Sequence, residues 1–381
     1  MTRICSKLPD SGTSIFTTMS KMAADHGAIN LSQGFPDFNV SEKLISLVSD
    51  AMLSGHNQYA PMAGLPDLRK VISHVTHDRY LYLPDPETEI TITAGATEAL
   101  FATIMALIQA EDEVIVFDPA YDSYDPAIRM AGGIPVHLTL KYPGFHIDWD
   151  EVRSAISDKT RLIMINTPHN PTGSILSHED LKTLETIALQ YDLFILSDEV
   201  YEHIIFDGHL HESVLRYDGL RTRSIAVSSF GKTFHATGWK VGYLVAPEYL
   251  TTEIRKVHQF VTFSVSSAVQ HALAGFLKYK NNYVELASLY QQKRDYFLRA
   301  IAKSRFEPLP SSGTYFQLLS YTGMDAKNDV EMAELLTREH GIASIPVSVF
   351  YKDGTDNSIL RFCFAKQEET LTKAAEILCK I

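Results

Sequence analysis

The sequence predicts an α/β fold: a three-layer domain with a mostly parallel mixed sheet, followed by a smaller α/β domain. Two features of the 381-residue chain support this prediction. Short segments that are almost continuously apolar recur from about residue 89, as expected of strands covered on both faces. Segments with apolar residues at helical spacing separate several of them, which is typical of a parallel sheet whose strands are connected by helices.

Each element is predicted from its local pattern, in chain order. The strands of the first domain are residues 89–93, 113–117, 161–165, 193–196, 224–227 and 241–245. Helical spacing predicts helices at 97–109 and 179–189, then a long helical region around 267–302 that is compatible with one long helix. Sparse strands at 314–319 and 359–364 follow. We therefore expect residues 1–40 to form an N-terminal arm and part of the small domain, 41–280 the large domain, and 281–381 the small C-terminal domain.

The composition argues against several partners and locations. A net charge of -12 leaves no basic surplus to bind phosphate backbones, so we expect no nucleic-acid partner. The chain lacks a long apolar run, and its first residues lack the apolar stretch of a signal peptide, so we expect a cytoplasmic protein that does not span a membrane. Its three cysteines are far apart and no His-Glu-x-x-His pair occurs, so we expect neither a disulfide framework nor a metal site.

Polar or glycine-rich clusters follow five of the predicted strands at their carboxyl ends. They are residues 95–97, 118–121, 166–170, 198–201 and 229–232. In an open α/β sheet this edge is where ligands bind, so the clusters together predict one pocket. Helix capping and turn formation explain any single cluster equally well, but they do not explain the recurrence after five strands.

The last of these clusters partly matches two other motifs. Gly231-Lys232-Thr233 is similar to the end of a nucleotide-binding P-loop, but the first glycine would fall at Ala226, inside an apolar strand. Ser229 and Lys232 have the spacing found in penicillin-binding serine enzymes, whose remaining motifs are absent or out of order. No Gly-x-Gly-x-x-Gly follows a strand, so we do not expect a nicotinamide dinucleotide.

Six motifs lie in a fixed order along the chain. They are residues 30–38 (NLSQGFPDF), 57–59 (NQY), 166–173 (NTPHNPTG), 197–201 (SDEVY), 229–233 (SFGKT) and 359–364 (ILRFCF). The ordered set covers nearly the whole chain and resembles the fold type I aminotransferases, especially the group of bacterial methionine aminotransferases and their kynurenine and glutamine aminotransferase relatives. The resemblance implies an enzyme that depends on pyridoxal 5'-phosphate, bound by the large domain.

The resemblance also implies roles around the cofactor ring. Lys232 would carry the cofactor as a Schiff base and then, as a free amine, shuttle a proton of the substrate. Asp198 would pair with the ring nitrogen and keep it protonated. Asn170 and Tyr201 would hydrogen-bond the phenolic oxygen, and Tyr121 would stack on the ring, although a core aromatic also explains Tyr121. Lys232, Asp198 and Tyr201 are the expected catalytic residues.

For the cofactor phosphate, the resemblance implies a site at the start of a helix. The backbone of Gly95, Ala96 and Thr97 would bind the anion there, because the first N–H groups of a helix are unpaired and its dipole attracts negative charge. Ser229 would add a hydroxyl. Lys240 would add a positive charge where many aminotransferases have arginine.

The substrate is expected to bind through its α-carboxylate. Arg361 resembles the arginine that holds this group with two parallel hydrogen bonds, and Asn170 and the backbone of Gly34 are expected beside it. Phe16 would line the side-chain pocket, although ordinary core packing explains this residue equally well.

Two residues imply a homodimer with shared active sites. Tyr59 matches a tyrosine that reaches the phosphate from the neighbouring subunit, and Phe263 matches an aromatic side chain that the partner adds to the substrate pocket. As for Phe16, plain packing is the alternative for Phe263.

The expected donor follows from the segment around Phe263. Residues 260–265 contain no arginine, whereas dicarboxylate aminotransferases carry one near there, so we expect methionine or another large neutral or aromatic amino acid as donor. A 2-oxo acid would be the acceptor, in a ping-pong reaction. Ser264 stands where relatives that favour kynurenine have histidine. Two alternatives stay open: a kynurenine or glutamine aminotransferase with β-lyase side activity on cysteine conjugates, and a noncatalytic binding or regulatory module on the same fold.

Overall fold

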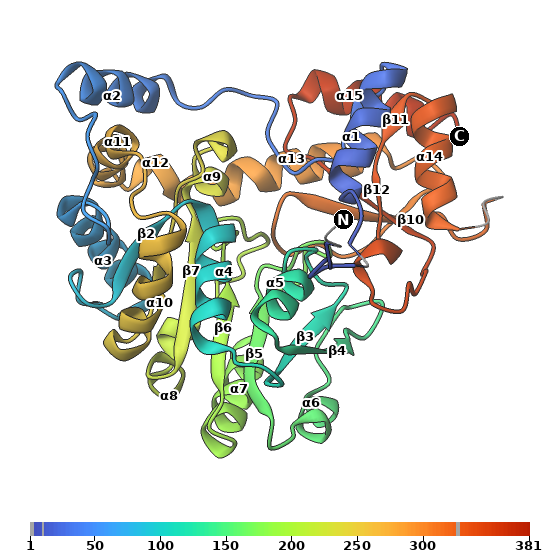
Figure 1. Cartoon of the computed structure of the whole chain (residues 1–381). Helices are drawn as coiled ribbons and strands as arrows, with labels where there is room; N and C mark the ends of the chain where they lie inside the picture. Colours follow the sequence, from blue (N-terminus) through green and yellow to red (C-terminus); the bar gives the residue numbers. More distant parts are fainter. Residues whose placement is uncertain (1–3, 10, 325–327) are drawn as a thin grey trace.

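A seven-stranded sheet forms the centre of the computed structural model, which describes residues 4–9, 11–324 and 328–381 (Figure 1). The strands are β2 (Ile90–Thr93), β3 (Glu113–Asp118), β4 (Ile134–Thr139), β5 (Thr160–Asn166), β6 (Phe194–Asp198), β7 (Ser224–Ser229) and β8 (Gly242–Val245). Their order across the sheet is β2-β8-β7-β6-β5-β3-β4. Strand β8 is antiparallel to both neighbours and the other four pairs are parallel. The predicted fold class is confirmed.

Helices cover both faces of this sheet, because successive side chains of a strand point to opposite sides. Val114 and Val116 of β3 pack in one core with residues of α4, α5 and α10. Ile115 and Phe117 pack in a second core that includes residues of α7. The helices around the sheet are α4 (Gly95–Leu107), α5 (Tyr124–Ala131), α6 (Trp149–Ala155), α7 (His178–Gln190), α8 (Asp218–Arg221), α9 (Phe230–Thr233) and α10 (Glu248–Val261). This double coverage explains the nearly continuous apolar strands.

Three further helices lie together next to β2, at the left of Figure 1. They are α2 (Glu42–Leu53), α3 (Pro66–Tyr80) and α11 (Ser267–Leu277). Among the residues that the structure describes, no helix combines the length and the apolar character needed to cross a bilayer.

The C-terminal part contains a smaller antiparallel sheet in the order β12-β13-β10-β9. Its elements are β9 (Glu307–Pro308), β10 (Phe316–Ser320), β12 (Ile345–Pro346) and β13 (Ile359–Cys363), with α13 (Leu286–Ala300), α14 (Asp329–Glu339) and α15 (Glu368–Leu378). The N-terminal α1 (Ile15–His26) packs against α14, and β1 (Ile29–Asn30) pairs with β11 (Ile342–Ala343) (Figure 1). The N-terminal segment thus lies beside the C-terminal part, while the domain boundaries at residues 40 and 280 stay predictions.

The structure adds to the sequence-based expectations for two regions. The helical region around 267–302 is not one helix but three: α11, the short α12 (Asn281–Val284) and α13. The side chain of Asn282 donates to the carbonyl of Phe276 at 2.7 Å, so a side chain takes an acceptor that a continuous helix would give to its own backbone. Strand β4 was not predicted. It lies at the sheet edge, is only partly buried and contains Pro135, so its sequence lacks the continuous apolar pattern of the inner strands.

Gly242 joins this sheet to the helix that follows β2. It pairs with Ser229 of β7 and with Thr93 of β2. A Cβ atom at this position would lie 2.7 Å from the carbonyl oxygen of Ser228 and 2.9 Å from the backbone nitrogen of Ala96. The missing side chain therefore allows the start of α4 to approach the ends of β7 and β8.

We predict that Gly242→Ala lowers the free energy of unfolding by about 1–3 kcal/mol, because the added methyl group must displace backbone atoms. Urea unfolding at a fixed protein concentration measures the change. Gly12→Ala is the control, because a Cβ there meets no atom within 4 Å. Equal unfolding midpoints for the two variants would show that the close approach at Gly242 is not a packing constraint.

Candidate functional site

A cavity of about 180 Å³ opens at the carboxyl ends of the parallel strands. Residues from all five polar clusters of the sequence line it. Of the predicted site residues, ten line this cavity: Gly95, Ala96, Thr97, Tyr121, Asn170, Asp198, Tyr201, Ser229, Lys232 and Lys240. The geometry brings these residues together, while the role assigned to each stays a prediction.

Lys232 occupies the single turn of α9 that follows β7. Its Nζ donates to the hydroxyl of Tyr315 at 3.0 Å and to the carbonyl of Gly34 at 3.3 Å. Tyr315 also donates to the same carbonyl. Burial lowers the pKa of the Lys232 amine from 10.5 to about 8, because a buried ammonium loses hydration. The site therefore holds an amine that loses its proton close to neutral pH.

Asp198 ends β6 and is almost fully buried. Burial raises the pKa of its carboxyl group to about 6, and hydrogen bonds from Tyr124 and from the backbone of Val200 oppose that rise. The hydroxyl of Tyr124 donates to Oδ2 of Asp198 at 2.7 Å. No ion pair of Asp198 is present within the described part of the chain. Asp198 is thus a buried carboxylate suited to a cationic ligand group.

The start of α4 forms an anion-binding end of the cavity. Gly95 begins this helix with a φ of 76°, and Ala96 and Thr97 place their N–H groups in its first turn, where anions are favoured. Lys240 lies across from this turn, with its Nζ 3.5 Å from Oγ1 of Thr97. Ser229 lines the same cavity.

Arg361 lies in β13 and does not itself line the cavity, but it contacts the cavity wall through Asn170. One of its terminal nitrogens donates to Oδ1 of Asn170 at 2.7 Å and the other to the carbonyl of Ser32 at 2.8 Å. Its side chain is almost completely buried, yet Nε has no hydrogen-bond partner in the described part of the chain. Burial lowers the pKa of Arg361 to about 10, so the guanidinium keeps its charge at neutral pH.

Three aromatic rings surround the Arg361 guanidinium. The central carbon lies 3.9 Å from the ring centre of Phe316, 5.1 Å from that of Phe16 and 5.7 Å from that of Phe350. Phe16 also lies 6.5 Å from Tyr121, ring centre to ring centre. A buried cation with an unused N–H in an aromatic cage is suited to bind a carboxylate.

Tyr59 and Phe263 are not brought to the cavity by their own chain. Tyr59 is 83% exposed and Phe263 is 46% exposed. Their rings contact each other edge to face at 5.4 Å. Their predicted contributions to the cavity require a second subunit.

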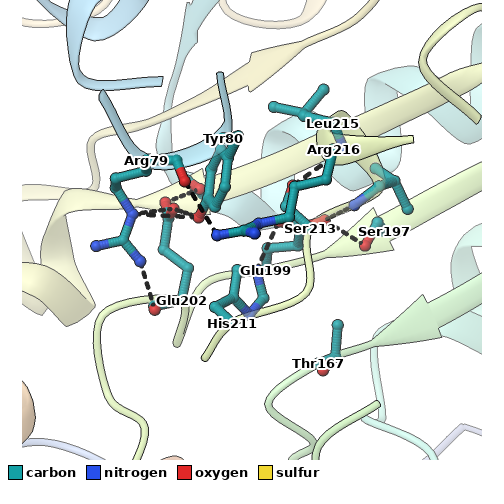
Figure 2. A network of polar contacts seen from close by, with 12 residues as sticks. Arg79, Tyr80, Thr167, Ser197, Glu199, Glu202, His211, Ser213, Leu215 and Arg216 are labelled. Carbon is teal, nitrogen blue, oxygen red and sulfur yellow. Dashed lines mark hydrogen bonds and ion pairs between the residues drawn. The ribbon is translucent and has the colours of Figure 1, made fainter. Parts of the chain in front are cut away.

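A polar network surrounds two acids, Glu199 and Glu202, in the turn that follows β6 (Figure 2). Glu199 accepts hydrogen bonds from Ser197 Oγ at 2.8 Å and from the Val214 backbone at 3.2 Å, and contacts His211 Nε2 at 2.8 Å. The next acid in this turn, Glu202, makes a separate set of contacts.

Glu202 ties this turn to α3, β7 and β8. Its carboxylate accepts hydrogen bonds from Tyr80, from Ser228 at 2.5 Å and from Tyr243 at 3.2 Å. Arg79 Nη2 donates to the Glu202 carbonyl at 2.9 Å (Figure 2). Burial alone would raise the pKa of Glu202, but the positive charge of Arg79 and the Ser228 hydroxyl help to hold it below its usual value. Glu202 is therefore a buried anion that connects four elements.

Sequence reasoning missed four residues of the site. Tyr124 lies three residues after Tyr121, and this spacing was the one available signal. Tyr315, Phe316 and Phe350 come from the C-terminal part and carry no local signal, because only the folded chain brings them to Lys232 and Arg361.

Comparisons with known proteins agree with this geometry. The family model for aminotransferase class I and II matches residues 26–378. The methionine aminotransferase of Escherichia coli (strain K12) is 50% identical, covering 98% of this chain and 97% of that protein. The kynurenine–oxoglutarate transaminase of Dictyostelium discoideum is 35% identical, covering 97% of this chain and 94% of that protein.

Two solved structures also superpose closely on this chain. YbdL from Escherichia coli, with an identified methionine aminotransferase function, superposes with a TM-score of 0.98 at 49% identity over the full length of both chains. N-Succinyldiaminopimelate aminotransferase from Mycobacterium tuberculosis has a TM-score of 0.95 at 34% identity, covering 99% of this chain and 100% of that chain.

We predict that Glu202→Gln lowers the free energy of unfolding by about 3 kcal/mol, because Arg79 then loses its buried counter-charge and an amide group faces hydroxyl donors. Urea unfolding at neutral pH measures the loss. The control is Glu369→Gln, which removes an exposed ion pair with Lys373 and should change stability by less than about 0.5 kcal/mol. An effect no larger than that of the control would contradict a connecting role for Glu202.

Proposed function

The chain belongs to the class I and II aminotransferases, and we propose that it moves the amino group of methionine, or of another large neutral or aromatic amino acid, to a 2-oxo acid. The observation that carries the donor preference is the 50% identity to the methionine aminotransferase of Escherichia coli over nearly the whole length. The absence of arginine from residues 260–265 supports a donor with one carboxylate. The reaction follows a ping-pong order, in which the first 2-oxo acid leaves before the acceptor enters.

The enzyme depends on pyridoxal 5'-phosphate, and the cavity suits that group. It offers a buried carboxylate that has no ion-pair partner among the described residues, a partly buried amine of low pKa and a helix start that approaches closely because Gly242 lacks a side chain. When bound, the cofactor supplies an aldehyde that joins to amines and a ring that accepts electrons from the α-carbon of the substrate.

Lys232 holds the cofactor and moves the proton. A pKa near 8 raises the uncharged fraction of its amine at neutral pH about 300-fold over an ordinary lysine, which makes Nζ a nucleophile and a base. Tyr315 and the Gly34 carbonyl position Nζ, so the same atom removes the proton from the α-carbon and returns it to the product.

The other cavity residues orient the ring and the phosphate. Asp198 would bind the ring nitrogen and keep it protonated, and the Tyr124 hydroxyl helps to keep the Asp198 carboxylate charged. Asn170 and Tyr201 would donate to the phenolic oxygen, and Tyr121 would stack on the ring. The N–H groups of Ala96 and Thr97 after Gly95, the Ser229 hydroxyl and the Lys240 ammonium would hold the phosphate.

Arg361 binds the α-carboxylate of the amino acid. The unpaired Nε supports this role, because a carboxylate would satisfy it, and Asn170 accepts a hydrogen bond from the same guanidinium. The backbone of Gly34, whose carbonyl accepts from Lys232 Nζ, would lie beside the bound carboxylate. The aromatic rings around the Arg361 guanidinium, which include Phe16, exclude water from it. Exclusion of water strengthens the attraction between the guanidinium and a carboxylate.

We further propose a cytoplasmic homodimer in which Tyr59 and Phe263 complete the cavity of the neighbouring subunit. Their exposure on the isolated chain supports this arrangement, because large aromatic side chains that are exposed together commonly form interfaces.

The 35% identity to a kynurenine–oxoglutarate transaminase supports a second candidate function. In this alternative the chain is an aminotransferase for kynurenine or glutamine that also releases thiols from cysteine conjugates. Product analysis separates the two reactions: transamination yields a 2-oxo acid with the side chain intact, whereas β-elimination yields pyruvate, ammonia and a thiol. A noncatalytic binding module would show a change in the cofactor spectrum when an amino acid is added, without turnover when a 2-oxo acid is supplied.

A panel of amino acids with a 2-oxo acid acceptor tests the proposed function. We expect the highest kcat/KM for methionine, and less than about 0.1% of that activity for Lys232→Ala, because Lys240, the other amine that lines the cavity, lies beside Thr97 at the proposed phosphate end and is not placed to move the proton. Chromatographic detection of the 2-oxo product measures both. Equal turnover by Lys232→Ala would reject the role of Lys232, and a better dicarboxylate donor would reject the substrate class.

We predict that Arg361→Lys raises the KM for methionine about tenfold and that Arg361→Ala raises it about a hundredfold, with smaller effects on kcat. Lysine keeps the charge but loses the second parallel hydrogen bond, and alanine loses both. Steady-state kinetics measures the series. Arg338→Lys on the exposed face of α14 is the control and should leave both constants unchanged. A flat KM across the Arg361 series would contradict the carboxylate role.

A further inference from the structure

One histidine outside the cavity lies between two carboxylates. His137 on the edge strand β4 contacts Asp118 Oδ1 through Nδ1 at 2.8 Å and Asp125 Oδ2 through Nε2 at 3.0 Å. Both ring nitrogens thus face carboxylate oxygens, an arrangement that a doubly protonated imidazole satisfies. None of these three side chains takes part in the chemistry described above.

The second oxygen of Asp118 reaches the C-terminal part of the chain. Asp118 Oδ2 accepts a hydrogen bond from the backbone N–H of Lys352 at 2.8 Å. Two residues away, the backbone N–H of Ala120 donates to the carbonyl of Phe350 at 2.7 Å. These two bonds join the end of β3 to the segment that includes η3 (Ser348–Phe350).

The joined segments form one wall of the amino-acid site. Phe350 packs on Phe16, with ring centres 5.8 Å apart, and belongs to the cage around Arg361. On the other side of the joint, Tyr121 follows Ala120 directly and lines the cavity. The position of the Asp118 carboxylate therefore decides where the wall sits relative to the guanidinium.

His137 is charged at neutral pH. Partial burial lowers its pKa, but the hydrogen bonds and negative charges of Asp118 and Asp125 outweigh burial and raise the pKa to about 9. The charged groups that face this cluster are Asp118 from β3, Asp125 and Arg129 from α5, and Lys352 from the C-terminal segment. Since the pKa is raised from 6.5, the stabilisation of the fold by the charged imidazole is fully present below about pH 6.5 and is lost as the pH rises through about 9.

We propose that His137 is a positioning residue for amino-acid binding, which holds Asp118 so that its second oxygen fixes the Lys352 backbone and seats Phe350 beside Arg361. This inference rests on the proposed function, because it assumes that the amino acid binds at Arg361. The histidine touches neither substrate nor cofactor and acts through Asp118 alone.

The first test is the kinetics of His137→Gln. We expect the KM for the amino-acid donor to rise about fivefold at pH 7 while kcat changes less than twofold, since the wall moves but Lys232 and Asp198 do not. The control is His178→Gln. His178 lies on α7 and its side chain hydrogen-bonds Tyr217, so this substitution also removes a hydrogen-bonded histidine but should leave the KM unchanged. A lower melting temperature with an unchanged KM would reduce His137 to a structural residue and overturn the proposal.

The pH dependence gives a readout that a structural role does not share. The ratio of the KM of His137→Gln to that of the wild type should fall toward one as the pH rises through about 9, because the wild type then loses the charge that the variant lacks. Taking the ratio cancels the titration of Lys232 and of the substrate amine. A ratio that stays constant from pH 7 to pH 10 would overturn the proposal.

A double-mutant cycle tests whether His137 acts through Asp118. Asp118→Ala should raise the KM at least as much as His137→Gln, and the double variant should show no further rise. If the two effects on the KM multiply in the double variant, the proposal is overturned. If Asp118→Ala does not fold, the pH series on His137→Gln still decides. Absence of any transamination by the wild type would instead reject the proposed function, so the two failures are distinguishable.

Discussion

The burial of two ionisable groups in one cavity is the constraint on which the rest of the structure depends. Asp198 is almost fully buried and Lys232 is partly buried, and the loss of hydration moves the pKa of each toward neutrality. They form no ion pair with each other in the described part of the chain, so each is held by neutral groups. An amine and a carboxylate that are separated in this way are free to bind opposite ends of a polar ligand.

The fold supplies what this burial requires. Parallel strands bring Asn166, Asp198 and Ser229 to one edge, and alternate side chains of each strand are covered by helices on both faces. Glu199 and Glu202 lie in the turn that follows Asp198. Their contacts with His211 and Ser228, which are farther along the chain, hold this turn in place. Hydrogen-bonded support of this kind keeps the residues around a poorly hydrated cavity in fixed positions.

The strand-end clusters could be predicted from the sequence because their signal is local. Lys232, Asp198 and Asn170 each follow an apolar segment within a few residues, and parallel strands carry such positions to the same edge. Tyr315 and Phe350 could not be predicted, because their contacts with Lys232 and Arg361 arise between segments far apart in the chain. Strand β4 was missed for the opposite reason: an edge strand needs only one partner and tolerates polar positions and a proline.

The proposed role of Lys232 depends on the low pKa of its amine, since both attachment of the cofactor and proton transfer need an uncharged amine. NMR titration of the cofactor-free protein with ¹³C-labelled lysine measures this pKa directly, and the spectrum of a variant without this lysine assigns the signal. We predict a titration midpoint of about 8. A midpoint at the ordinary lysine value of 10.5 would contradict this role.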